Sequence, residues 1–230
     1  MYLGPALARA HSSHTIRNVP DDFYAGAFGR AYTAYMERPW LSRVIGRIVW
    51  GGDVAPYYRS MAAVGRLADG ATVIDVPCGA GPAFHAIPPD AQISYVAVDL
   101  SDSMLARARR RAEARGLTQV EVIRGDASDL PLEANSADLF LSYWGLHCFA
   151  RPERALVEAA RVLRPGGELV GATFVRGDGL RQRLLVRPNT KAFGAVGSRA
   201  EVEQWLAAAG FGDVVLHPSG PMLYFNASST

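Results

Sequence analysis

Short runs of apolar and β-branched residues alternate with longer amphipathic stretches from residue 72 to residue 230. Such alternation predicts strands of a mostly parallel sheet, joined by crossover helices that cover both of its faces. The expected strands are Thr72–Val76, Ile93–Val98, Val120–Ile123, Ala137–Ser142, Glu168–Phe174, Asp213–His217 and Met222–Asn226. The pattern therefore predicts an open, seven-stranded α/β sheet.

Helices are expected over Ser101–Arg115, Pro152–Leu163 and Ser198–Gly210, each with a recognisable boundary. Ser101 can cap the first helix, a Pro-Gly-Gly turn at 165–167 ends the second, and Ser198 with Glu201 forms a capping box for the third. The Pro/Gly turn at 217–221 is of hairpin length, so the last two strands should form an antiparallel hairpin at the sheet edge.

Residues 1–68 are rich in aromatic side chains and are expected to form a helical arm on the same core, which comprises residues 69–230. Pro39 and Gly51-Gly52 should divide the arm into short helices. Its aromatic residues, including Tyr24 and Tyr32, suit either a lid over an acceptor pocket or plain core packing.

Composition limits the class of protein. Lys and Arg number 24 against 22 Asp and Glu, a net charge of +2, which is too small for a dedicated nucleic-acid binder. Two distant cysteines favour neither zinc nor disulfides, and with no apolar leader or spanning segment they predict a cytoplasmic protein without a membrane span.

The candidate ligand-binding residues come directly after the first four predicted strands, because ligands of open parallel sheets bind at the carboxyl ends of the strands. Gly79 and Gly81 permit a close ligand approach, and Asp99 stands 24 positions after Asp75, where it can accept hydrogen bonds from a ribose. Phe84 occupies the position of the third glycine of a dinucleotide fingerprint, which disfavours a nicotinamide-dependent oxidoreductase. An adenosine-containing ligand without a diphosphate fits better.

The segments VIDVPCGAG, VAVDLSDSML, GDASDLP, ADLFLSYWGLH and RVLRPGGEL, in this order, resemble the successive motifs of class I S-adenosylmethionine-dependent methyltransferases. Within that superfamily the chain looks most like the small-molecule branch that includes ubiquinone and menaquinone methyltransferases. The resemblance implies a Rossmann-like fold and S-adenosylmethionine as the methyl donor. It implies donor contacts from Asp75, Pro77, Cys78, Gly79, Ala80, Gly81, Asp99, Leu100, Met104, Asp126, Ala127, Ser142 and Tyr143.

Several of these residues also have a purely structural interpretation that needs no ligand. Asp75 and Asp126 also suit helix caps or turns, Met104 suits the core, and Cys78 suits a small buried filler. Pro77 replaces the usual first glycine of the loop and removes an N–H. A protein that binds the donor without catalysis is therefore a second hypothesis.

Transfer from a sulfonium needs positioning and no metal, so we expect in-line transfer to a small-molecule acceptor. His147 is the first candidate for a general base and His85 the second, although a histidine after the fourth strand also suits packing. Trp144 and His147 would face the acceptor. The basic stretch 175–197 is expected to be an insert that contacts an anionic substrate or membrane surface, or that forms a surface helix or a homodimer contact.

Overall fold

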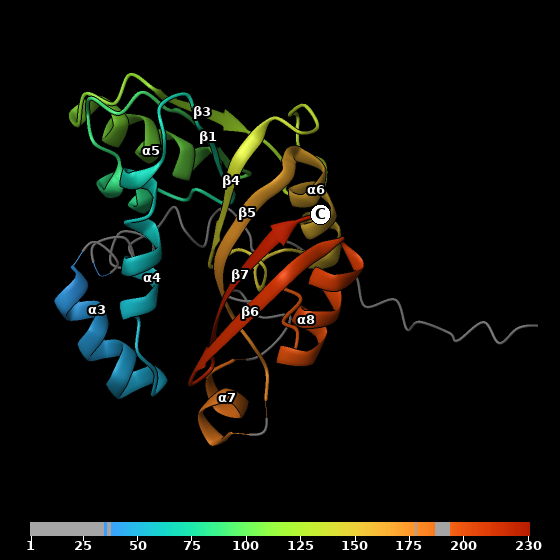
Figure 1. Ribbon diagram of the computed structural model, residues 1–230. Coiled ribbons are helices and arrows are strands. Elements are labelled where there is room, and N and C mark those ends of the chain that lie inside the picture. The colour runs from blue at the N-terminus through green and yellow to red at the C-terminus, as the bar shows by residue number, and fades with distance from the viewer. Residues whose placement is uncertain (1–34, 36–37, 178, 187–193) are drawn as a thin grey trace, which may run out of the picture.

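The computed structural model describes Tyr35 and residues 38–177, 179–186 and 194–230. Seven strands form one sheet in the order β3-β2-β1-β4-β5-β7-β6 (Figure 1). Their bounds are β1 Thr72–Asp75, β2 Ser94–Asp99, β3 Val120–Arg124, β4 Ala137–Tyr143, β5 Leu163–Phe174, β6 Phe211–Ser219 and β7 Met222–Ser229. The first five strands pair in parallel, and β7 runs antiparallel to both β5 and β6. The predicted open sheet with an antiparallel edge hairpin is confirmed.

The last three strands, β5, β6 and β7, are each longer than the sequence-based expectation, and β7 continues to Ser229. Strand β5 begins at Leu163, which already pairs with Ala137, and the predicted turn at 165–167 is an irregularity within the strand. Gly166 takes a φ of +77° there. Strand β6 is also longer than expected, because its pairing with β7 continues through an irregularity between Gly212 and Val215.

The helices enclose the sheet in two layers with separate cores. One face carries α4 (Ala55–Met61), the short 3-10 helices η2 (Val64–Arg66) and η3 (Pro82–Ala86), and α5 (Asp102–Ala114). The opposite face carries α6 (Pro152–Val162) and α8 (Arg199–Ala208), whose apolar residues pack with Ile74, Phe140 and Phe225. The Ser198 capping box at the start of α8 is present as expected.

The described part of the N-terminal segment packs on the sheet. It comprises α3 (Pro39–Ile45), the π-helical turn η1 (Gly46–Trp50), α4 and η2, so Pro39 and Gly51 do mark helix boundaries. Tyr57 is fully buried against the sheet, and the hydroxyl of Tyr224 donates to the Asp53 carbonyl at 2.9 Å. Tyr24 and Tyr32 lie outside the described residues.

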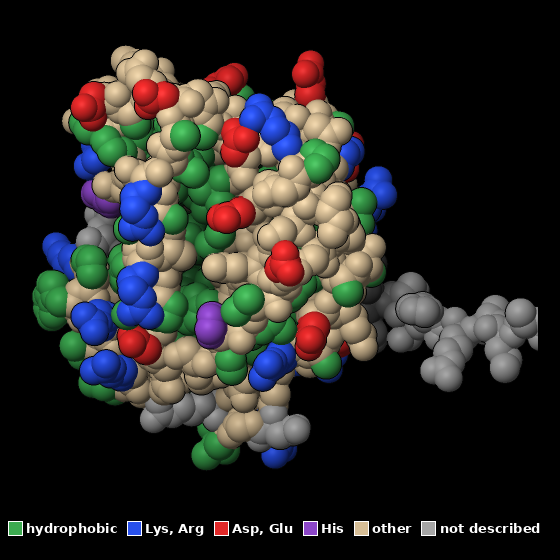
Figure 2. All heavy atoms as spheres, viewed as in Figure 1, with side chains coloured by type: hydrophobic (Ala, Val, Ile, Leu, Met, Phe, Trp, Pro, Cys, Tyr) green, Lys and Arg blue, Asp and Glu red, His purple; other side chains and the backbone are tan. Residues whose placement is uncertain are grey.

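Basic and apolar side chains gather over α3 and α4 (Figure 2). The exposed arginines of this layer are Arg38, Arg43, Arg47, Arg59 and Arg66, and the exposed large hydrophobic residues include Trp40 and Ile48. Within the predicted insert, α7 (Leu180–Leu185) is a short helix with Leu180 and Leu184 exposed. None of the described helices is both long and apolar enough to cross a membrane.

Candidate functional site

The predicted site residues meet at the carboxyl edge of the sheet. Asp75 ends β1, Asp99 ends β2, Asp126 follows β3 and Tyr143 ends β4. These four strands are consecutive neighbours in the order β3-β2-β1-β4. Parallel pairing brings their carboxyl ends to one edge, so the side chains that the sequence placed in separate motifs share one site.

The loop after β1 is held against β2 by backbone hydrogen bonds. The Cys78 N–H donates to the Val98 carbonyl at 2.8 Å, and the Gly79 N–H donates to the Asp99 carboxylate at 2.8 Å. Gly79 has a φ of +52°, and a Cβ at that position would meet no atom of the described residues within 4 Å. The glycine thus leaves open space beside a carboxylate, which suits the close approach of a ligand.

Pro77 is accommodated by a neighbour that lacks a side chain. Its peptide bond with Val76 is cis, and a Cβ on Gly145 would come within 2.4 Å of its Cδ. Cys78 is buried, and burial together with the carboxylates of Asp99 and Asp75 raises the pKa of its thiol. The buried-filler interpretation of Cys78 is consistent with this environment.

Asp75 is a carboxyl group enclosed in the core. Its exposed fraction is 2%, and its Oδ2 accepts a hydrogen bond from the Tyr95 hydroxyl at 2.9 Å. Burial raises the pKa of Asp75 to about 7, the Tyr95 hydrogen bond opposes this rise, and the charge of Asp99 adds to it. A cation such as the ammonium group of an amino-acid ligand would relieve this cost of ionising a buried carboxyl group.

Asp99 is oriented by the backbone on both sides. Its Oδ1 accepts from the Ser101 N–H at 2.9 Å while Oδ2 accepts from Gly79. A carboxylate has about four lone-pair positions, so it can accept ribose hydroxyls in addition to backbone N–H groups. The next residue, Leu100, is 40% exposed and offers an apolar surface beside Asp99. Met104 is buried, as expected if it is a core residue.

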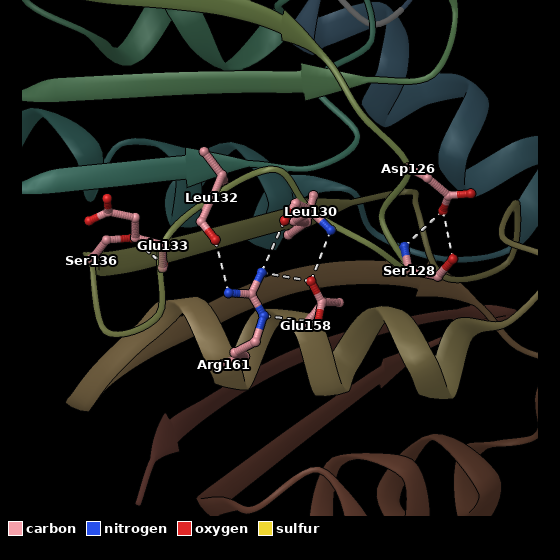
Figure 3. A network of polar contacts seen from close by, with 8 residues as sticks. All are labelled: Asp126, Ser128, Leu130, Leu132, Glu133, Ser136, Glu158 and Arg161. Atoms are coloured by element: carbon pink, nitrogen blue, oxygen red, sulfur yellow. Dashed lines mark hydrogen bonds and ion pairs between the residues drawn. The ribbon is translucent and has the colours of Figure 1, made fainter.

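The loop after β3 is fixed to α6 (Figure 3). Asp126 accepts hydrogen bonds at 2.8 Å from the backbone N–H and the hydroxyl of Ser128, so it does stabilise a turn, as its alternative interpretation proposed. Farther along the loop, Glu158 accepts the Leu130 N–H at 2.9 Å, and Arg161 donates to the Leu130 and Leu132 carbonyls. Helix α6 thereby sets the position of the loop that holds Asp126 and Ala127.

Ser142 and Tyr143, the last two residues of β4, face opposite sides of the sheet. Ser142 is buried and lines a small apolar cavity with Val76, Ala127 and Leu146. Tyr143 points to the other face, where its hydroxyl donates to Ser60 Oγ at 2.9 Å and its ring packs edge-on against Tyr57. Of this predicted pair, only Tyr143 therefore contacts the N-terminal layer.

Trp144 has an unusual backbone and an unpaired polar atom. It takes a φ of +58°, and its buried Nε1 has no hydrogen-bond partner among the described residues. Its ring lies 5.2 Å from that of Phe174, which in turn lies 4.5 Å from that of Trp50. Strained non-glycine residues gather at ligand sites, and an indole N–H is a hydrogen-bond donor, so this environment suits an acceptor with a polar group.

His147 lies deeper than its candidate role as a base requires. It is 5% exposed, and its Nδ1 accepts the Phe174 N–H at 3.2 Å and lies 3.2 Å from Thr173 Oγ1. Burial lowers the pKa of His147 to about 3, which opposes proton uptake near neutral pH. His85, the second candidate, is exposed on η3, and burial of part of its ring together with Arg115 lowers its pKa.

The sequence analysis assigns no role to two structurally important groups, Tyr95 and Glu158. The strand pattern includes Tyr95 only as a strand residue, although a tyrosine that is fully buried in β2 needs a partner for its hydroxyl. The helix pattern includes Glu158 only as a helix residue, although an acid between the apolar positions of α6 is a signal of a buried ion pair. Among the described residues, no group of three or more His, Cys, Asp or Glu side chains could hold a metal ion.

Comparison with known proteins agrees with this geometry. Residues 74–171 match the family described as a methyltransferase domain. The ubiquinone/menaquinone biosynthesis C-methyltransferase UbiE of Roseobacter denitrificans is 38% identical over 107 residues, which are 46% of this chain and 43% of that protein. An uncharacterized chloroplastic methyltransferase of Arabidopsis thaliana is 28% identical over 209 residues, covering 84% of this chain and 57% of that protein. The chain thus spans less than two thirds of the length of these curated relatives.

A solved structure shows the same fold. A SAM-dependent methyltransferase from Aquifex aeolicus superposes with a TM-score of 0.62 at 21% identity, over 87% of this chain and 98% of that chain. The superposed share of this chain, 87%, exceeds the part matched by the family, residues 74–171.

Proposed function

We propose that the chain is a class I, S-adenosylmethionine-dependent methyltransferase that transfers a methyl group to a small organic acceptor, since residues 74–171 match a methyltransferase domain and UbiE is a relative. The observation that carries the proposal is the convergence of Asp75, Gly79 and Asp99 at one sheet edge, with open space at Gly79. This edge offers a carboxylate for a cation, a carboxylate for hydroxyl groups and, among the described residues, open space beside Gly79.

Each donor contact follows from the chemistry of the residue present. Asp75 holds the ammonium group, and Asp99 accepts the ribose hydroxyls. Leu100 covers the adenine, Asp126 accepts from its amino group, and the Ala127 backbone meets the ring. The methionine part lies beside the loop formed by Pro77, Cys78, Gly79, Ala80 and Gly81. The remaining donor-site residues, Met104, Ser142 and Tyr143, line or support the pocket.

Catalysis in this proposal is positioning. S-adenosylmethionine, when bound, supplies a methyl group already activated by a sulfonium. The chain then has to hold the acceptor in line and exclude water, which needs no metal. The rings of Trp144 and Phe174 pack together at the carboxyl ends of β4 and β5, where the acceptor has to approach, and Tyr143 is the last residue of β4.

The acceptor class is supported by these aromatic rings and by a relative. A planar, partly apolar acceptor with an oxygen would stack on aromatic rings and accept the Trp144 N–H. The Roseobacter denitrificans relative is named for C-methylation in ubiquinone and menaquinone biosynthesis. We propose a hydroxylated aromatic or quinone-like small molecule, and no nucleic acid, as the acceptor.

Four further features stay predictions. His147 as a general base is tested by substitution, a homodimer by light scattering, and a cytoplasmic location by fractionation. The lid role of Tyr24 and Tyr32 is tested by removing residues 1–34.

Isothermal titration tests the donor site. S-adenosylmethionine and S-adenosylhomocysteine should bind with micromolar affinity, NADH should not, and Asp99→Ala should abolish binding of both sulfur ligands. Binding of NADH alone would overturn the proposal in favour of an oxidoreductase. Donor binding without turnover on any of a panel of phenols and quinones would favour the donor-binding protein that Pro77 first suggested.

A further inference from the structure

We propose that Tyr95 is a positioning residue for donor binding, and that Phe84 holds the Tyr95 ring in place so that its hydroxyl orients the Asp75 carboxyl group. This inference rests on the proposed function, since it concerns how the chain receives the ammonium group of S-adenosylmethionine. The residues form one line of contacts from the glycine loop to the carboxyl group.

The first contact lies inside the glycine loop. Gly81 has a φ of +73°, and a Cβ there would come within 2.5 Å of the Phe84 ring. Phe84 is fully buried on η3, so its ring fills the space that Gly81 leaves. The residue that departs from the dinucleotide fingerprint therefore has a packing role in this loop.

The second contact joins the loop to β2. The rings of Phe84 and Tyr95 lie 5.6 Å apart at an interplanar angle of 89°, which is the favoured edge-on arrangement of aromatic pairs. Tyr95 has no exposed surface, so its ring is held on all sides. Its hydroxyl is thereby fixed 2.9 Å from Asp75 Oδ2.

The charges around Asp75 make the hydrogen bond from the Tyr95 hydroxyl important for its ionisation. The titratable groups that act on Asp75 and its surroundings are Tyr95 and Asp99 from β2, Cys78 from the loop, Tyr143 from β4 and, through Cys78, Arg109 from α5. Asp99 opposes ionisation of Asp75, whereas the Tyr95 hydroxyl favours it. Loss of that hydroxyl should raise the pKa of Asp75 further, so fewer molecules would carry the carboxylate at neutral pH.

Calorimetric titration of S-adenosylhomocysteine into the full chain tests the proposal with Tyr95→Phe. Titrations at pH 6 to 7.5, in buffers of different ionisation enthalpy, give both the affinity and the number of protons released. Tyr95→Phe should weaken binding roughly tenfold or more at pH 7, as expected for losing one hydrogen bond to a charged group. It should also release more protons on binding than the wild type, because more of its Asp75 is protonated beforehand.

Tyr224→Phe is the matched control. It also removes one buried tyrosine hydroxyl with a hydrogen bond of 2.9 Å, from the same core layer but away from Asp75. It should keep the wild-type affinity and proton release, and thermal unfolding checks that both variants fold. Phe84→Leu should shift affinity in the same direction as Tyr95→Phe.

Two results separate the possible failures. If the wild type binds the ligand and Tyr95→Phe matches it in both affinity and proton release, the positioning role is wrong while the donor site stands. If the folded wild type binds neither S-adenosylhomocysteine nor S-adenosylmethionine, the proposed function itself fails and the role of Tyr95 falls with it.

Discussion

At the scale of single residues, the buried carboxyl group of Asp75 serves donor binding in our proposal but lowers the stability of the ligand-free protein. Its folded pKa of about 7 exceeds the ordinary value of 3.8, so the folded chain holds this proton to higher pH than the unfolded chain does. The cost of burying the charge therefore grows as the pH rises from 3.8 towards 7 and stays constant above that range. A neutral isostere at this position would avoid the cost.

Asp75→Asn should consequently abolish donor binding and yet stabilise the ligand-free protein. The Tyr95 hydroxyl can still donate to the amide oxygen, so the gain should be about 2–4 kcal/mol at pH 8. Thermal and urea unfolding at pH 8 and pH 5 measure it, and the gain should shrink at pH 5. An equal effect at both values would mean that Asp75 is not titrating in the folded state.

His147 gives the opposite sign of pH dependence. Its folded pKa of about 3 lies below the ordinary value of 6.5, so the unfolded chain binds the extra proton first. The stability that the neutral ring contributes is present above pH 6.5 and is lost as the pH falls towards 3. His147→Asn keeps an acceptor for the Phe174 N–H but has no titrating ring.

Unfolding free energies of wild type and His147→Asn should therefore diverge on acidification. Between pH 7 and pH 5 the wild type should lose about 2 kcal/mol relative to the variant, because Asp75 titrates equally in both. Turnover measured in parallel decides the mechanism. A drop of about 100-fold with unchanged donor affinity would favour the base role, whereas a small change would leave His147 a packing residue.

At the scale of elements, hydrogen bonds from helix α6 hold the loop after β3 in position. Glu158 is buried beneath that loop, and its hydrogen bonds with Arg161 lower its pKa, so the ionised pair is maintained at neutral pH. Replacing Glu158 would leave the Leu130 N–H and the Arg161 guanidinium without this acceptor (Figure 3).

Glu158→Ala should lower the unfolding free energy by about 2 kcal/mol or more and weaken donor binding through the loosened loop. Urea unfolding and calorimetric titration measure the two effects. Glu153→Ala is the matched control, since Glu153 is an exposed acid in the first turn of the same helix. Loss of stability with an unchanged donor affinity would show that the hydrogen bonds of Glu158 do not determine the positions of Asp126 and Ala127.

At the scale of the whole molecule, the sequence predicts what depends on periodicity and local chemistry. The positions of the strands, the edge hairpin and the capping box at Ser198 follow from patterns that act over a few residues, whereas the strand order comes from the structure. The five-residue extension of β5 from Leu163 depends on pairing with Ala137, which no local pattern encodes. The burial of His147 likewise depends on Phe174, a residue 27 positions away along the chain.

The N-terminal segment has two parts with different expected roles, because the sequence assigns a lid to its first part and the structure buries side chains of its second part. Val54, Tyr57, Met61 and Val64 are buried in the core cluster on one face of the sheet, so residues 54–64 are part of the core. Residues 1–34 hold Tyr24 and Tyr32, the side chains that the sequence assigns to a lid. The first part should therefore matter for the acceptor and the second for folding.

Removing residues 1–34 should leave cooperative thermal unfolding and donor affinity close to wild type but abolish methyl transfer to the acceptor. Removing residues 1–66 should abolish folding, because it exposes the apolar face that Tyr57 and Met61 cover. Circular dichroism, calorimetry and a methyl-transfer assay separate these outcomes. If the shorter truncation unfolds the protein, the aromatic residues before Tyr35 are core; if it keeps full turnover, no lid is needed, and the acceptor is held by the strand ends alone.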